Sequence, residues 1–144
     1  MAITVSLFDD AARAIGAGEH IAGDTYKLKL YSAITVDLTD TTLAQVDAGG
    51  TEATAGTGYT AGGQALASVA ITKVGNDAKF DAADVTWTAA GGSIVATHGV
   101  IYNDTDAGDP PLFYVNFDGT QTALDTANFN VNWNAAGIIT FTVT

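Results

Sequence analysis

The stretch "NFNVNWN", Asn128 to Asn134, alternates apolar and polar residues without interruption. Phe129, Val131 and Trp133 fall on one phase of the alternation, and asparagines fill the other. Successive side chains of a β-strand point to opposite faces, so this period predicts a strand with one buried face and one hydrated face.

The alternation resumes after the short connection "NAAG", 134–137. Ile139, Phe141 and Val143 then alternate with threonines. Two alternating runs joined by a short connection predict that the sequence ends in a β-hairpin.

Shorter alternating runs occur upstream, and turn-forming residues separate them. The run 94–102 is apolar on both faces, so we expect it to be a central strand. About seven or eight short strands predict a mainly β protein, an antiparallel β-sandwich of the jelly-roll type. The other expected strands lie within 25–32, 66–74, 83–89 and 112–119.

Two segments have a helical rather than an alternating pattern. In "SLFDDAARAIGAG", Ser6 is a candidate N-cap and Gly16 a candidate stop. Asp9 and Asp10 would then lie in the first turn, where the helix dipole favours acids. A second helix of one or two turns is expected at 42–47.

The chain carries 16 acidic residues against 5 basic ones, a formal net charge of −11. This charge would repel a phosphate backbone, so we expect no nucleic-acid partner. No apolar run reaches the ~18 residues of a membrane span, and the N-terminus lacks the basic start of a signal peptide. We therefore expect no membrane partner and no cleaved leader. With no cysteine, disulfides and thiolate chemistry are excluded.

The length predicts one β-sandwich domain over 1–144, with a short contact segment at about 1–20. Within it, the glycines of "GTGYTAGG", 56–63, have nearly the spacing of a phosphate-binding loop. However, Gln64 stands where such a loop needs lysine, and a strand-like rather than a helical segment follows. We interpret the stretch as a turn in which glycine supplies positive φ, and we expect no bound cofactor.

The acidic loop "NDTDAGDPP", 103–111, spaces its aspartates like calcium ligands. Counted from Asp104, the sixth and twelfth positions of an EF-hand loop would be Asp109 and Val115, where glycine and glutamate are required. A loose calcium site from Asp104, Asp106 and a carbonyl remains an alternative to a solvated connection, which we favour.

The only histidines, His20 and His98, are too separated in sequence to predict a metal centre. His98 falls on the expected central strand and is predicted to be a hydrogen-bonded core residue. No Gly-x-Ser-x-Gly elbow is present, and carboxylate pairs such as Asp81 and Asp84 follow from the acidic composition alone. We expect a protein that is not an enzyme, with no catalytic residues.

Trp87 and Trp133 could form an aromatic platform for a sugar. Both fall on the inward phase of their expected strands, beside Val85 and Val131. Core packing is therefore favoured over carbohydrate binding.

Six segments, taken in order, resemble a family of small virion structural proteins of tailed bacteriophages and prophages. They are "GDTYKLKLYS", "GTGYTAGGQAL", "AKFDAADVTWTA", "THGVIYND", "PLFYVNFDG" and "FNVNWNAAGIITFT". The resemblance extends from about Asp24 onward. It implies a decoration or cement protein, made in the host cytoplasm, that binds the major capsid protein on the outer surface of the head.

The charge agrees with an outward position, because packaged DNA would repel an acidic protein inside the head. Binding the assembled lattice would stabilise it by mass action, and capsid symmetry favours a homo-oligomer, a dimer or a trimer. Tail, neck or fibre-base placement is the alternative within the virion, and a carbohydrate-binding module is the alternative outside it.

The apolar N-terminal residues are the predicted interface with the capsid or with another subunit. The equally weighted alternative is that this segment adds an edge strand to the protein's own sheet. The predicted interface residues are Ile3, Val5, Leu7 and Phe8.

Overall fold

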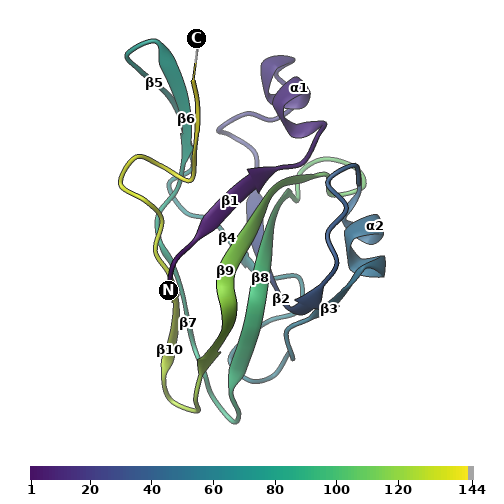
Figure 1. Ribbon diagram of the computed structural model, residues 1–144, viewed down its shortest axis with the longest axis vertical. Coiled ribbons are helices and arrows are strands. Elements are labelled where there is room, and N and C mark those ends of the chain that lie inside the picture. Colours follow the sequence, from purple (N-terminus) through teal and green to yellow (C-terminus); the bar gives the residue numbers. More distant parts are fainter. Residues whose placement is uncertain (143–144) are drawn as a thin grey trace.

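The computed structural model describes residues 1–142 and is mainly β, with antiparallel strands and two short helices (Figure 1). This confirms the predicted fold class. The helices are α1 (Ala11–Gly16) and α2 (Leu43–Ala48). The strands are β1 (Thr4–Leu7), β2 (Tyr26–Ile34), β3 (Gly50–Glu52), β4 (Gln64–Ala65), β5 (Ala70–Val74), β6 (Asp77–Asp81), β7 (Val85–Thr88), β8 (Ile94–Asn103), β9 (Pro111–Ala123), β10 (Asn128–Val131) and β11 (Ile139–Phe141).

The largest sheet has six strands. Its order is β1-β9-β8-β2-β3, and β4 pairs separately with β2. β8 lies between β9 and β2, which confirms the central position predicted from its two apolar faces. Two smaller sheets, β10-β7 and β11-β6-β5, make up the rest of the sandwich-like fold (Figure 1).

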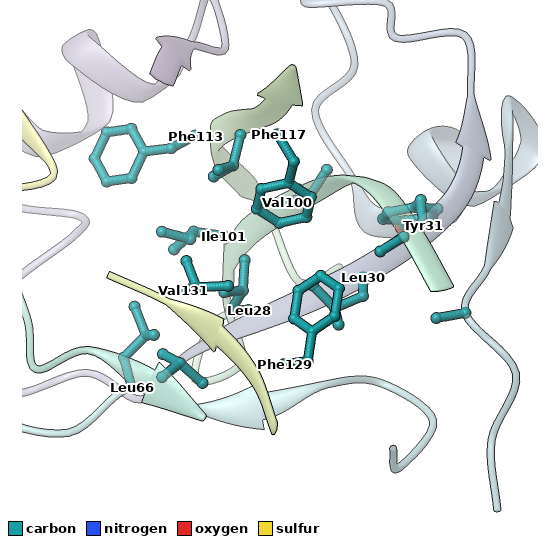
Figure 2. Close-up of a cluster of buried hydrophobic side chains, with 14 of the residues drawn as sticks. Leu28, Leu30, Tyr31, Leu66, Val100, Ile101, Phe113, Phe117, Phe129 and Val131 are labelled. Carbon is teal, nitrogen blue, oxygen red and sulfur yellow. The ribbon is translucent and has the colours of Figure 1, made fainter. Parts of the chain in front are cut away.

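The inner face of the large sheet packs against the smaller sheets and forms the hydrophobic core (Figure 2). Leu28 of β2 is fully buried, and Phe117 of β9 meets Phe129 of β10 edge-on, with 5.8 Å between ring centroids. Phe80 of β6 packs in the same way on Phe113 of β9, at 4.9 Å. Burying each side chain of this size contributes about 1.5–3 kcal/mol, so these contacts hold the three sheets together.

The predicted C-terminal hairpin is wrong. β10 pairs with β7, whereas β11 pairs with β6, so the two strands belong to different sheets. The linker between them is fixed by the neighbouring chain: Trp133 N–H donates to Asp84 Oδ1 at 2.8 Å, and Ile138 N–H donates to Phe80 O at 2.9 Å. These contacts keep the C-terminal segment alongside 77–88 and prevent it from folding back on itself. Val143 lies outside the described residues.

The expected strand 66–74 is also divided. Leu66 is buried and its N–H donates to Tyr26 O at 2.8 Å, so the chain stays at the large sheet after β4. It then crosses to the smaller sheet through Ser68, whose φ is 56°, and continues as β5.

The N-terminal helix begins later than predicted. Ser6 lies in β1 and does not cap a helix, because its backbone pairs with β9. Asp10 occupies the N-cap position, but its carboxylate binds Arg13 and no helix N–H. In α2, by contrast, Thr42 and Gln45 form a complete capping box, as the local pattern requires.

A partly buried ion-pair network fixes the glycine-rich segment on the other face of β2. Lys29 is 6 % exposed and its Nζ lies 2.8 Å from Asp47 Oδ1 of α2 and 3.2 Å from Glu52 Oε2 of β3. Glu52 Oε1 also accepts hydrogen bonds from Tyr59 OH at 2.9 Å and Gly62 N–H at 2.6 Å. The segment is therefore a turn held by a carboxylate. Positive φ occurs at Gly56, Gly58, Gly62 and Gly63.

Two glycines of this turn provide a matched test of close packing. A Cβ at Gly63 would lie 2.0 Å from Leu28 O, whereas a Cβ at Gly56 would meet nothing within 4 Å, and φ is near +85° at both. At either position an alanine would be strained by the left-handed backbone conformation, which lowers stability by about 1–2 kcal/mol. We expect Gly63→Ala to lower the free energy of unfolding in urea by at least ~2 kcal/mol more than Gly56→Ala. Equal losses would contradict the close approach to β2.

All 5 tyrosines should resist ionisation in the folded protein. Burial, as the largest cause, raises the pKa of each above its ordinary value of 10.0. A pKa raised by folding gives stability that is present below pH 10 and lost as the pH rises further. Tyrosinate absorbance should therefore appear together with loss of the β-sheet circular dichroism signal. Ionisation near pH 10 with the sheet signal intact would contradict this burial.

Candidate contact surface along strand β1

Strand β1 forms one edge of the large sheet, and only β9 pairs with it among residues 1–142. Phe8 N–H donates to Leu112 O on β9 at 2.9 Å. Hydrogen-bonding direction alternates along an antiparallel strand, so the backbone groups of Val5 and Leu7 point away from β9. They form an open edge onto which an additional strand could be added.

The predicted interface residues divide into two groups. Phe8 is 0 % exposed and belongs to the core, so its proposed role as an external contact is wrong. Its burial follows from its position at the end of β1, where the chain turns inward toward α1. Ile3, Val5 and Leu7 are half-buried and pack against the core. The segment is thus an edge strand of the protein's own sheet, and partner binding by these three residues stays a prediction.

Two hollows lie beside the N-terminal segment, and both are lined by Ile3, the residue before β1. One, of about 390 Å³, separates β1 from the segment 133–140. The other, of about 290 Å³, lies between Met1 and the strands β9 and β10. No aspartate, glutamate, lysine, arginine or histidine lines either hollow. We call the open edge of β1 together with these two hollows the edge groove.

The charged side chains of the protein pair with one another elsewhere. Arg13 binds Asp10 and Glu19, and Lys27 binds Asp104. Lys29 and Lys79 also have carboxylate partners, so four of the 5 basic residues are neutralised locally. The acidic surplus is left on the surface, and the edge groove, which has no charged side chain, is distinct from it.

The two tryptophan side chains pack mainly in or against the hydrophobic core. Trp87 is 5 % exposed and packs edge-on against Phe129, which confirms the core prediction. Trp133 is half-buried beside the edge groove, and its indole N–H donates to Ala83 O at 3.1 Å.

His98 is hydrogen-bonded, as predicted, but only half-buried. Its ring stacks on Tyr114 at 5.1 Å, and Nδ1 lies 2.8 Å from Thr97 Oγ1. Burial lowers the pKa of His98 below its ordinary value, because a partly desolvated imidazolium is disfavoured.

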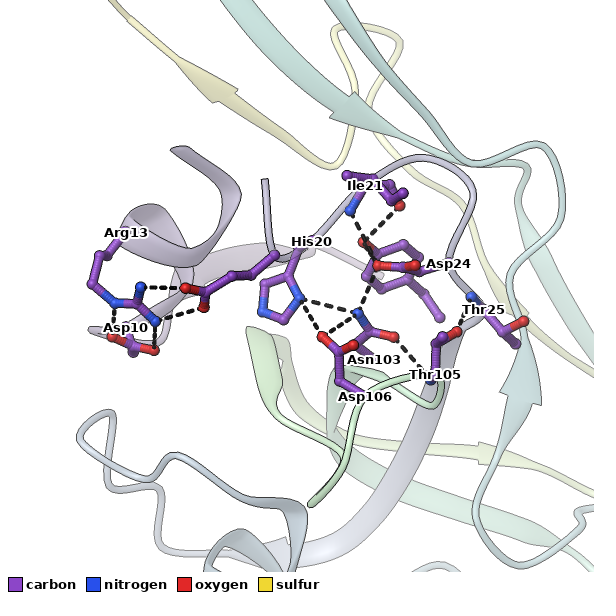
Figure 3. A network of polar contacts seen from close by, with 11 residues as sticks. Asp10, Arg13, His20, Ile21, Asp24, Thr25, Asn103, Thr105 and Asp106 are labelled. Carbon is purple, nitrogen blue, oxygen red and sulfur yellow. Dashed lines mark hydrogen bonds and ion pairs between the residues drawn. The ribbon is translucent and has the colours of Figure 1, made fainter. Parts of the chain in front are cut away.

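The two aspartates of the predicted loose calcium site are held by different partners. Asp104 Oδ2 lies 2.8 Å from Lys27 Nζ. Asp106 instead approaches His20, together with Asp24 and Asn103 (Figure 3). Sequence reasoning missed this second group because His20 and Asp106 are 86 positions apart in the sequence, and no local pattern connects them.

Comparison of the chain with protein-family models, curated proteins and solved structures gives no match. No helix among residues 1–142 has the length and apolar character needed to cross a membrane. The interpretation of the edge groove therefore depends on its own geometry and chemistry.

Removing the Phe8 side chain tests whether β1 is part of the core. Phe8→Ala should lower the free energy of unfolding by about 3–5 kcal/mol, because it leaves a cavity at a fully buried site. Val74→Ala, at a side chain that is 53 % exposed, should change it by less than about 0.5 kcal/mol. Urea unfolding measures both, and a loss below about 1 kcal/mol for Phe8→Ala would show that β1 detaches readily.

Proposed function

We propose that this protein is a non-enzymatic structural component of a tailed bacteriophage particle. Its place is the outer surface of the head, where it acts as a decoration or cement protein. The ordered resemblance of six sequence segments to phage virion proteins supports the class of function. The net charge of −11 supports an outward position, since DNA inside the head would repel the protein.

One observation supports the contact mode: an open strand edge beside a groove without charged side chains in a strongly acidic protein. The central area of a protein interface is depleted of charged residues, whereas the surface around it is not. An open edge binds an extended segment through backbone hydrogen bonds, and adjoining hollows select its side chains. The occupant we propose is an extended, uncharged segment of the major capsid protein.

Such binding explains how a small protein could stabilise a head. Each contact along β1 adds modest free energy, but the capsid repeats it at every equivalent position. A ligand that binds the assembled lattice and not the free subunit favours assembly by mass action. The expected dimer or trimer would place several copies around one symmetry axis.

Protein quantification on purified phage particles tests the proposed placement. A decoration protein should approach the copy number of the major capsid protein, because it binds repeated sites on the shell. A tail, neck or fibre-base protein would be far scarcer, and that result would overturn the head assignment while keeping a virion role. Absence from purified particles would overturn both.

The edge groove is tested by placing a charge in it. Ile3→Asp puts a carboxylate beside the open edge, and we expect at least tenfold weaker co-sedimentation with heads lacking this protein. Val74→Asp is the matched control, because it adds the same charge to an apolar side chain on β5, away from β1. Urea unfolding checks that both variants are folded. Equal binding by both variants would contradict the assigned surface.

A further inference from the structure

A polar cluster joins the segment after α1 to the loop between β8 and β9 (Figure 3). Two hydrogen bonds align these chain segments: Thr25 N–H donates to Thr105 Oγ1 at 2.8 Å, and Asp104 N–H donates to Thr25 O at 2.8 Å. Neither bond uses the side chains of the cluster itself. The side chains discussed below are therefore brought together by the fold before any ligand is considered.

Three donor atoms converge between these segments: His20 Nδ1, Asp24 Oδ2 and Asp106 Oδ2, all within 4.8 Å of one another. His20 is 4 % exposed, and its Nδ1 lies 3.4 Å from Asp106 Oδ2. That separation is long for a hydrogen bond. It matches the spacing of two ligands on one ion, since bonds of about 2.1 Å at a tetrahedral angle put the ligand atoms roughly 3.4 Å apart.

The Asn103 amide stands in the middle of this cluster. Its Nδ2 lies 2.9 Å from Asp24 Oδ2, 3.0 Å from His20 Nδ1 and 3.1 Å from Asp106 Oδ2. Its Oδ1 accepts from Thr105 N–H at 2.9 Å, which fixes which end of the amide faces the cluster. An amide has two N–H donors, so it cannot give a proton to all three atoms. Asp24 Oδ2 also accepts from Ile21 N–H at 3.1 Å and from Tyr26 OH at 3.4 Å, so the amide need not serve it. All three acceptors still converge on the one position that the amide nitrogen fills.

The cluster also lacks a basic partner. Among residues 1–142, the ion pairs of Arg13 and Lys27 go to other carboxylates, and none connects Asp24 or Asp106 with lysine or arginine. Two carboxylates thus meet a buried imidazole with no fixed positive charge beside them. The positive charge beside them is therefore either that of a protonated His20 or that of a bound cation.

We propose that His20, Asp24 and Asp106 bind a divalent metal ion of the Zn²⁺ class, with the Asn103 amide moving aside. An imidazole with two carboxylates suits zinc, whereas calcium requires six to eight oxygen ligands. The Asp106 side chain is 38 % exposed, which gives the ion a route from solvent and room for a water ligand. The ion would fasten the segment after α1 to the β8–β9 loop, and this inference does not depend on the proposed function.

Thermal unfolding of tag-free, chelator-treated protein tests the site. Zinc about 100-fold above its Kd should raise Tm by roughly 5 °C or more, and magnesium or calcium should not. His20→Gln and Asp106→Asn should each abolish the shift. His98→Gln should keep it, because His98 contacts Tyr114 and Thr97 and is outside the cluster. A shift that survives in His20→Gln, or an equal shift with calcium, would overturn the proposal.

Nuclear magnetic resonance keeps the proposal testable if His20→Gln does not fold. The wild-type chain has 2 histidines, so their ring resonances are easily separated. Zinc should displace the His20 signals and leave those of His98 unchanged. Unmoved His20 signals in zinc, or movement of His98 alone, would show that the cluster is a purely structural hydrogen-bond network.

Discussion

The whole structure depends on covering the inner face of the large sheet. Two smaller sheets cover it without joining its strand ladder, so side-chain packing is the main contact between the layers. The contacts of Phe80 with Phe113 and of Phe117 with Phe129 bridge the layers. Phe8, the residue after β1, is buried in this core and holds β1 against β9. The edge of β1 that faces away from β9 stays open. The same burial therefore stabilises the core and produces the candidate contact surface.

Sequence reasoning succeeds where side chains repeat locally and fails where distant segments meet. Alternation predicted the β class, since burial on one face leaves a period-two signature. The central place of β8 was predicted from an apolar run with no polar face. It could not predict that β10 and β11 pair with different strands, because the contact of Trp133 with Asp84 joins residues far apart in sequence. Partner choice in a sheet is a tertiary property. The edge strand was one of two equal alternatives; the pairing of β1 with β9 and the burial of Phe8 establish it, and partner binding by Ile3, Val5 and Leu7 stays a prediction.

The two candidate sites differ in chemistry but are linked along the chain. The edge groove has no charged side chain and offers backbone groups, whereas the cluster around His20 contains carboxylates and an imidazole. Helix α1 connects them, and Arg13 stabilises the turn that leads to His20 through hydrogen bonds to Asp10 and Glu19. An ion at the cluster would fasten the residues after α1, His20 and Asp24, to the β8–β9 loop. The chain that begins with β1 would then be held at its other end. The sequence alone did not reveal this cluster, because its candidate ligands come from two loops that lie far apart along the chain.

The central claim is that this protein acts by offering the open edge of β1 to an extended segment of another protein. Hydrogen–deuterium exchange, compared between free protein and protein bound to phage heads, tests it most directly. Strand addition would protect the outward amides of β1 and slow exchange in 1–8 and 133–140, while the glycine-rich turn stays unchanged. Unaltered exchange in 1–8 with new protection elsewhere would contradict the account.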